Sequence, residues 1–116
     1  MDADVQRRDQ IEAALRVELQ NGTGPILHFQ PVMGQRGDVI GVEGLMRWSQ
    51  PALGPIPPME IIPIAEECGL MEELGRLVVL YACEAARRWP DLAVAVNLSP
   101  IQFRGEDFAA GLKALV

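Results

Sequence analysis

Apolar residues alternate along this chain between two spacings, one typical of amphipathic helices and one typical of buried strands. They recur with a period of 3.6 in the first 21 residues and occupy both faces of the extended run at 92–98. Glycine and proline separate the segments, because glycine accepts turn conformations and proline ends helices. The predicted elements are, in order, helix 1–21 capped by Asp4, strand 26–30 ended by Pro31, strand 39–48, proline-rich loop 49–58, helix 59–67, helix 74–88, strand 92–98 and a helix that begins near Asp107.

Strands and helices that follow one another in this order predict an α/β fold, with the first two strands joined as a hairpin. The third strand has two different faces. One carries large apolar residues, which we expect to pack on the apolar stripe Leu74–Ala85; the other carries Ala93, Ala95 and then Asn97. Open α/β sheets and α/β barrels place their chemistry at the carboxyl ends of strands, where Asn97 lies.

Composition narrows the class of protein. The 116 residues fit one domain, and an apolar fraction of 49% is ample for a core. The net charge of −6 argues against binding to a DNA or RNA duplex, which requires a basic face. No apolar run approaches the roughly 18 residues of a membrane span, and no leader opens the chain. We expect a cytoplasmic protein without a membrane partner in this segment.

The two cysteines, Cys68 and Cys83, lie in helix-like apolar patterns. A disulfide framework requires a denser set of cysteines, and a zinc site requires closer spacing with histidine partners, of which His28 is the only candidate. Two buried free thiols are the expected state.

Three polar residues in or at the ends of the strands are candidates for chemistry. Glu43 interrupts a strand pattern, so it is exposed, paired with Arg47 on the same strand face, or a cation ligand beside an Arg47 that holds an anionic group. Asn97 and Gln30 either cap the turns after their strands or contribute to the same site. Oxygen ligands of this kind suit magnesium, calcium or manganese.

Four consecutive motifs give these candidates a context. They are His28-Phe29-Gln30-Pro31, Gly41-Val42-Glu43-Gly44-Leu45-Met46-Arg47-Trp48, Pro58 to Glu67, and Val94-Ala95-Val96-Asn97-Leu98-Ser99 followed by Gln102-Phe103. In this order the motifs resemble the EAL domain family, whose members hydrolyse the bacterial second messenger cyclic di-GMP. The resemblance covers residues 5–116.

The resemblance implies the N-terminal portion, about three strands, of a variant TIM (β/α)8 barrel whose first strand runs against the others. It also implies hydrolysis of cyclic di-GMP to linear pGpG by metal-activated water, with Mg²⁺ or Mn²⁺ in the complete domain. The residues to which it assigns roles are Glu43 and Asn97 as metal ligands and Gln30, Leu45, Arg47 and Pro63 as substrate contacts, with Arg47 at a phosphate.

The chain departs from the family pattern in two ways. Gly44 replaces the usual alanine of the naming motif, at a cost of roughly 0.5–1 kcal/mol for glycine in a strand. A barrel of this type takes about 250 residues, so the paired aspartates and the catalytic lysine are expected outside this segment. Lys113, the single lysine, does not match that position, and no catalytic residue is predicted here.

The expected organisation is a linker helix, residues 1–21, followed by an incomplete EAL barrel, residues 22–116. The linker resembles helices that follow an upstream GGDEF or sensory domain. We expect the sheet to be completed by the remaining half of the barrel or by a homo-oligomer partner, with Phe29, Val42 and Ala95 on the faces that meet it.

Three functions compete. In the first, the parent protein is a cyclic di-GMP phosphodiesterase, of which this segment alone is inactive. In the second, it is a degenerate EAL module that binds cyclic di-GMP without cleaving it. In the third, it is a protein-interaction scaffold. Retention of Gln30, Glu43, Arg47 and Asn97 favours the first.

Overall fold

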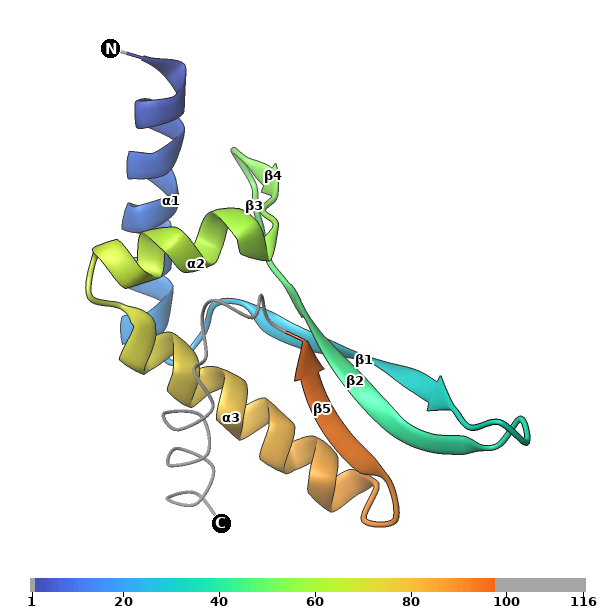
Figure 1. The fold of residues 1–116 in the computed structure, drawn as a ribbon. Helices are drawn as coiled ribbons and strands as arrows, with labels where there is room; N and C mark the ends of the chain where they lie inside the picture. Colours follow the sequence, from blue (N-terminus) through green and yellow to red (C-terminus); the bar gives the residue numbers. More distant parts are fainter. Residues whose placement is uncertain (1, 98–116) are drawn as a thin grey trace.

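The computed structural model describes residues 2–97, and its elements follow the predicted order (Figure 1). They are α1 (Ala3–Gln20), β1 (Ile26–Met33), β2 (Val39–Arg47), β3 (Ser49–Gln50), β4 (Gly54–Pro55), α2 (Pro58–Glu67), α3 (Met71–Arg88) and β5 (Ala93–Asn97). The helix predicted near Asp107, as well as Lys113, lies outside the described residues. The mixed α/β class is confirmed.

The helix ends follow local chemistry. Asp2, rather than the predicted Asp4, caps α1, because its carboxylate accepts a hydrogen bond of 3.2 Å from the Asp4 amide. Pro58 begins α2, where a missing N–H costs nothing, and Gly69 follows it with a φ of +74°. Arg87 and Arg88 occupy the last turn of α3, where the helix dipole favours positive charge.

Three strands form the main sheet in the order β1–β2–β5, with β1 antiparallel and β5 parallel to β2. The prediction that Pro31 ends the first strand is wrong: β1 continues through it to Met33, with Pro31 opposite Val42. Within the described sheet β1 is an edge strand, where a residue without an N–H is tolerated. The second strand ends at Arg47, and the predicted loop that follows contains the short β3–β4 pair.

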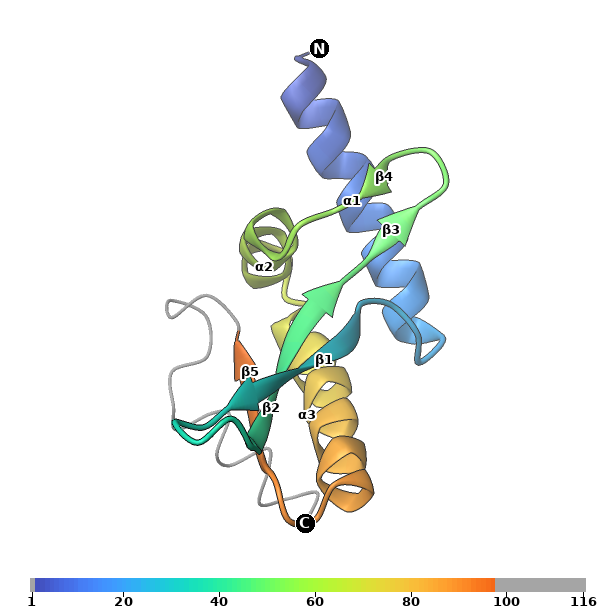
Figure 2. The same cartoon turned by 90° about the vertical axis from the view of Figure 1, so that its right-hand side faces the viewer.

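The core lies on one side of this sheet, the side on which α3 packs (Figure 2). Val42 and Met46 of β2 are 6% and 1% exposed and face this core, with Leu74 and Val78 of α3 at 0% and 1%. The expectation that Phe29 and Val42 belong to the open face is therefore wrong. The ring of Phe29 packs against the core and lies edge-on to Trp89, with ring centroids 5.8 Å apart, whereas Ala95 is exposed as expected.

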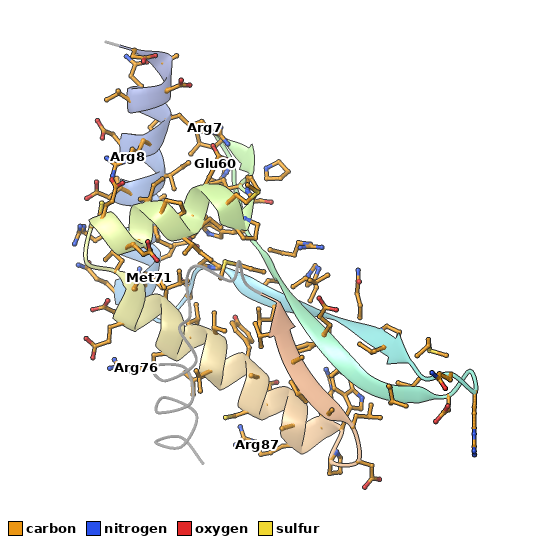
Figure 3. The ribbon with its side chains drawn as sticks, in the orientation of Figure 1. Arg7, Arg8, Glu60, Met71, Arg76 and Arg87 are labelled. Atoms are coloured by element: carbon orange, nitrogen blue, oxygen red, sulfur yellow. The ribbon has the colours of Figure 1, made fainter. Side chains whose placement is uncertain are left out.

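Helix α1 is packed into the same core rather than standing apart. Its Ile11 and Leu15 are 1% and 0% exposed, as the 3.6-residue period predicted. Arg7 makes two hydrogen bonds to the carboxylate of Glu60 on α2, at 2.7 and 2.9 Å, and Figure 3 shows the two side chains pointing toward one another. An ion pair between Arg8 and Glu67 adds a second link between the helices.

Both cysteines are free thiols, as predicted, but only Cys83 is buried, while Cys68 at the end of α2 is half-buried. None of the helices in the described part of the chain has the length and apolar character that a membrane crossing requires.

Candidate functional site

The face of the sheet opposite the core carries four of the predicted site residues, namely Gln30, Glu43, Leu45 and Arg47. Side chains alternate along β2, so Val42, Gly44 and Met46 are buried while Glu43 and Leu45 are half-buried and Arg47 is exposed. Gln30 of β1 is exposed. Ala93 and Ala95, the small residues of β5, are exposed as well. The alternation therefore gathers polar groups and small side chains on one open surface.

Strand register arranges this surface in rows across the sheet. Gln30, Glu43 and Ala95 form one row, because Gln30 is the partner of Glu43 in the β1–β2 pair and Ala95 is its partner in the β2–β5 pair. Directly opposite residues in an antiparallel pair such as β1–β2 have Cβ atoms about 4.5–5.5 Å apart. The side chains of Gln30 and Glu43 thus begin at neighbouring positions on the sheet, and the position on the other side of Glu43 carries only the methyl group of Ala95.

The next row joins His28, Leu45 and Asn97, and Arg47 follows one row further along β2, opposite Ile26. Because β5 runs parallel to β2, Asn97 and Arg47 come at the carboxyl ends of neighbouring strands, the edge at which α/β sheets hold their chemistry. His28, which the sequence does not single out as a site residue, is exposed in this row. Because His28 and Gln30 are two residues apart on the same strand, their spacing is the sequence signal that places His28 on the same face as Gln30.

The structure does not adopt the alternative in which Glu43 and Arg47 pair with each other. The ion pairs found among residues 2–97 join other residues, and Nη1 of Arg47 instead donates a hydrogen bond of 2.9 Å to the carbonyl of Met46. Four residues of a strand span about 13 Å, which is long for one ion pair. Both charges are therefore left for other partners on the open face.

The donor chemistry fits a hard divalent cation as far as this part of the chain goes. Glu43 supplies a carboxylate on β2, and Asn97 ends the neighbouring parallel strand two residues beyond the register partner of Glu43. Oxygen donors of this type suit Mg²⁺ or Mn²⁺. Within residues 2–97 no group of three or more His, Cys, Asp or Glu side chains is placed to hold a metal ion.

Pro63 occupies a different element from the other candidates. It lies inside α2 and is exposed, in a helix whose other middle residues, Ile62 and Ile64, are buried. Helix α2 follows the β3–β4 pair that continues from Arg47, so the chain connects Pro63 to the carboxyl end of β2.

Comparison with known proteins gives one family. The family model described as EAL domain matches residues 12–116. The cyclic di-GMP phosphodiesterase PdeR of Escherichia coli is 37% identical over 110 residues, and the bifunctional diguanylate cyclase/cyclic di-GMP phosphodiesterase MucR of Pseudomonas aeruginosa is 39% identical over 109 residues. These alignments cover 91% and 89% of this chain, which spans only 16% of the length of each relative.

Solved structures show the same fold. The PaMucR phosphodiesterase in complex with c-di-GMP superposes with a TM-score of 0.72 at 36% identity, covering 90% of this chain and 44% of that chain. The FimX EAL domain of Pseudomonas aeruginosa bound to c-di-GMP gives a TM-score of 0.65 at 31% identity, with the same coverage of 90% and 44%. The chain belongs to the EAL domain family and has the fold of the N-terminal portion of this TIM-barrel-type domain.

Proposed function

We propose that the protein containing this chain hydrolyses cyclic di-GMP to linear pGpG. The observation that carries the proposal is the row Gln30–Glu43–Ala95, in which Gln30 lies directly opposite Glu43 on the open face of the sheet. Arg47 follows on the same face and makes no ion pair within the described residues. Relatives named as cyclic di-GMP phosphodiesterases, and EAL structures that bind c-di-GMP, support the substrate class.

In this proposal Glu43 and Asn97 hold Mg²⁺ or Mn²⁺ together with ligands from the rest of the barrel. When bound, the cation lowers the pKa of a water molecule and stabilises charge on the phosphodiester. Glu43 contributes the negative charge that attracts the cation. Ala95, opposite Glu43, leaves room for substrate above the sheet.

The remaining site residues bind the dinucleotide. Arg47 donates to a phosphate, for which its planar guanidinium is well suited, and Gln30 offers amide donors and an acceptor beside Glu43. Leu45 lies between Glu43 and Arg47 on the open face and supplies an apolar contact for a base, to which Pro63 contributes from α2. The catalytic base and the paired aspartates belong to the rest of the barrel, so this chain by itself has no turnover.

The proposed organisation has residues 1–21 as a linker from an upstream GGDEF or sensory domain and residues 22–116 as the beginning of the barrel. The partner of the open face is the remaining half of the barrel or a homo-oligomer partner. The protein acts in the cytoplasm, where the messenger is found, and takes no DNA or RNA duplex.

The test is incubation of the complete protein with cyclic di-GMP and Mg²⁺ or Mn²⁺, with pGpG measured by chromatography and a chelator control. Metal-dependent release of pGpG is the expected result. Tight binding of cyclic di-GMP without cleavage would replace this function with that of a degenerate binding module, and neither binding nor cleavage would leave a protein-interaction scaffold.

A further inference from the structure

A carboxylate at the end of α1 holds the residues that follow Arg47. Oε2 of Glu18 accepts hydrogen bonds from Nε1 of Trp48 at 2.5 Å and from Nε2 of Gln50 at 2.8 Å. The donors are 30 and 32 residues away in sequence, so the contact ties the last turn of α1 to the end of β2 and to β3. Hydrogen bonds to an ionised acceptor are roughly twice as strong as neutral ones.

Trp48 is fixed from two directions. Its indole, in a side chain only 7% exposed, donates to Glu18, while its carbonyl accepts a hydrogen bond of 2.8 Å from the amide of Ile56. Ile56 is itself 2% exposed. The backbone immediately after Arg47 is therefore anchored to a helix on one side and to the strand connection on the other.

Arg47 depends on this anchoring for its direction. In the described part of the chain its side chain makes one hydrogen bond, to the carbonyl of Met46, and no ion pair. Because that bond is to its own neighbour, the guanidinium takes its position from the local backbone and not from a distant partner. A phosphate contact weakened by about 1.4 kcal/mol costs about tenfold in binding.

We infer that Glu18 is a positioning residue for Arg47: through Trp48 and Gln50 it fixes the carboxyl end of β2 so that Arg47 meets the phosphate of the dinucleotide. This inference rests on the proposed function and adds to it a residue of α1, outside the sheet that carries the site. A role limited to attaching α1 would affect stability, but it would not depend on whether Arg47 is present.

The experiment uses the complete protein and compares Glu18→Ala with Glu12→Ala. Both carboxylates lie on α1, and alanine favours the helix in each case, but Glu12 pairs with Arg16 of the same helix and not with β2. We expect Glu18→Ala to raise the KM for cyclic di-GMP about tenfold with little change in kcat. Glu12→Ala should leave both KM and kcat within about twofold of wild type. Glu18→Gln, which retains an acceptor for Trp48, should recover part of the loss.

The decisive readout is the dependence on Arg47. In an Arg47→Ala background, Glu18→Ala should raise KM by less than about twofold, because the group that it positions is gone. Trp48→Phe, which keeps an aromatic ring and removes the donor, should likewise raise KM when Arg47 is present and have little effect when Arg47 is replaced by alanine. For a protein that binds without cleaving, Kd replaces KM.

An equal loss from Glu18→Ala in the presence and absence of Arg47 would overturn the inference and leave the proposed function intact. A wild-type protein that neither binds nor hydrolyses cyclic di-GMP would overturn both. Unfolding midpoints of each variant, measured alongside, identify any loss caused by unfolding.

Discussion

Replacing Gly44 by alanine would restore the family's usual naming motif, and the structure predicts that it destabilises this protein. Strand propensity alone predicts the opposite, because glycine in a strand costs roughly 0.5–1 kcal/mol relative to alanine. The difference comes from the core side of β2, where Gly44 lies opposite Phe29 in the register of the hairpin.

The magnitude follows from the space available. A Cβ at Gly44 would lie 2.9 Å from Cε1 of Phe29 and 3.2 Å from Cδ1 of Leu27, both closer than normal packing allows. The ring of Phe29 is held edge-on against Trp89, which restricts its retreat. Overpacking of this kind costs about 1–3 kcal/mol. After subtraction of the glycine penalty, the free energy of unfolding should fall by about 1 kcal/mol.

The assay is urea unfolding of the complete domain for Gly44→Ala in the wild-type and Phe29→Leu backgrounds. The smaller side chain should remove most of the cost of the added methyl group, which a double-mutant cycle measures as coupling. Gly41→Ala provides a comparison, because its Cβ would lie 2.8 Å from the carbonyl oxygen of Ala93. This is a backbone atom, which no side-chain rotation can move. Gly41→Ala should cost more than Gly44→Ala. A Gly44→Ala variant that is stabilised in both backgrounds would refute the packing argument.

Three further outcomes follow. The 116-residue chain alone should release no pGpG above buffer background with Mg²⁺ or Mn²⁺, and hydrolysis free of contaminating enzyme would contradict the proposed assignment of the catalytic groups. In the complete protein Arg47→Ala should act chiefly on KM, because a phosphate contact is lost; unchanged kinetics would return Arg47 to a surface role. The hydrogen bond from Arg7 holds the pKa of Glu60 below its ordinary value. The pair therefore stabilises the fold fully at a pH above the ordinary pKa of a glutamate, and this stabilisation is lost as the pH falls through the lowered pKa. The difference in stability between wild type and Arg7→Gln should therefore shrink between about pH 6 and pH 3, whereas a difference that stays constant would exclude the ion pair as its cause.

The order and type of the main elements could be predicted from sequence because each has a strong period and clear ends. The stripe from Leu74 to Ala85 predicts α3, and Arg88 and Trp89-Pro90 predict its end. The strand boundaries depend on neighbouring strands that the local sequence does not reveal. Pro31 is compatible with β1 only because β1 lies at an edge of the described sheet.

In the candidate site, too, local sequence predicts some features and tertiary neighbours determine the others. The alternation of β2 predicts that Glu43 and Arg47 share a face, but only the register shows that Gln30 is the neighbour of Glu43. The helical period of α1 puts Glu18 on the same face as Ile11 and Leu15, and nothing in the local sequence explains a carboxylate on this apolar face. Its partners are Trp48 and Gln50, and a contact across 30 residues has no local signal.

The proposed function depends most directly on the carboxylate of Glu43, which we place in a metal-dependent phosphodiesterase site. The most direct measurement is the rate of pGpG formation by the complete protein with Mg²⁺ or Mn²⁺ for Glu43→Gln, compared with Glu84→Gln on the exposed side of α3. Even groups that only support a metal ligand contribute about 10–100-fold to metal affinity or activity. We therefore expect the rate of Glu43→Gln to be about one hundredth of the wild-type rate or less, and the rate of Glu84→Gln to equal that of wild type. A Glu43→Gln protein that cleaves cyclic di-GMP at the wild-type rate would contradict the account.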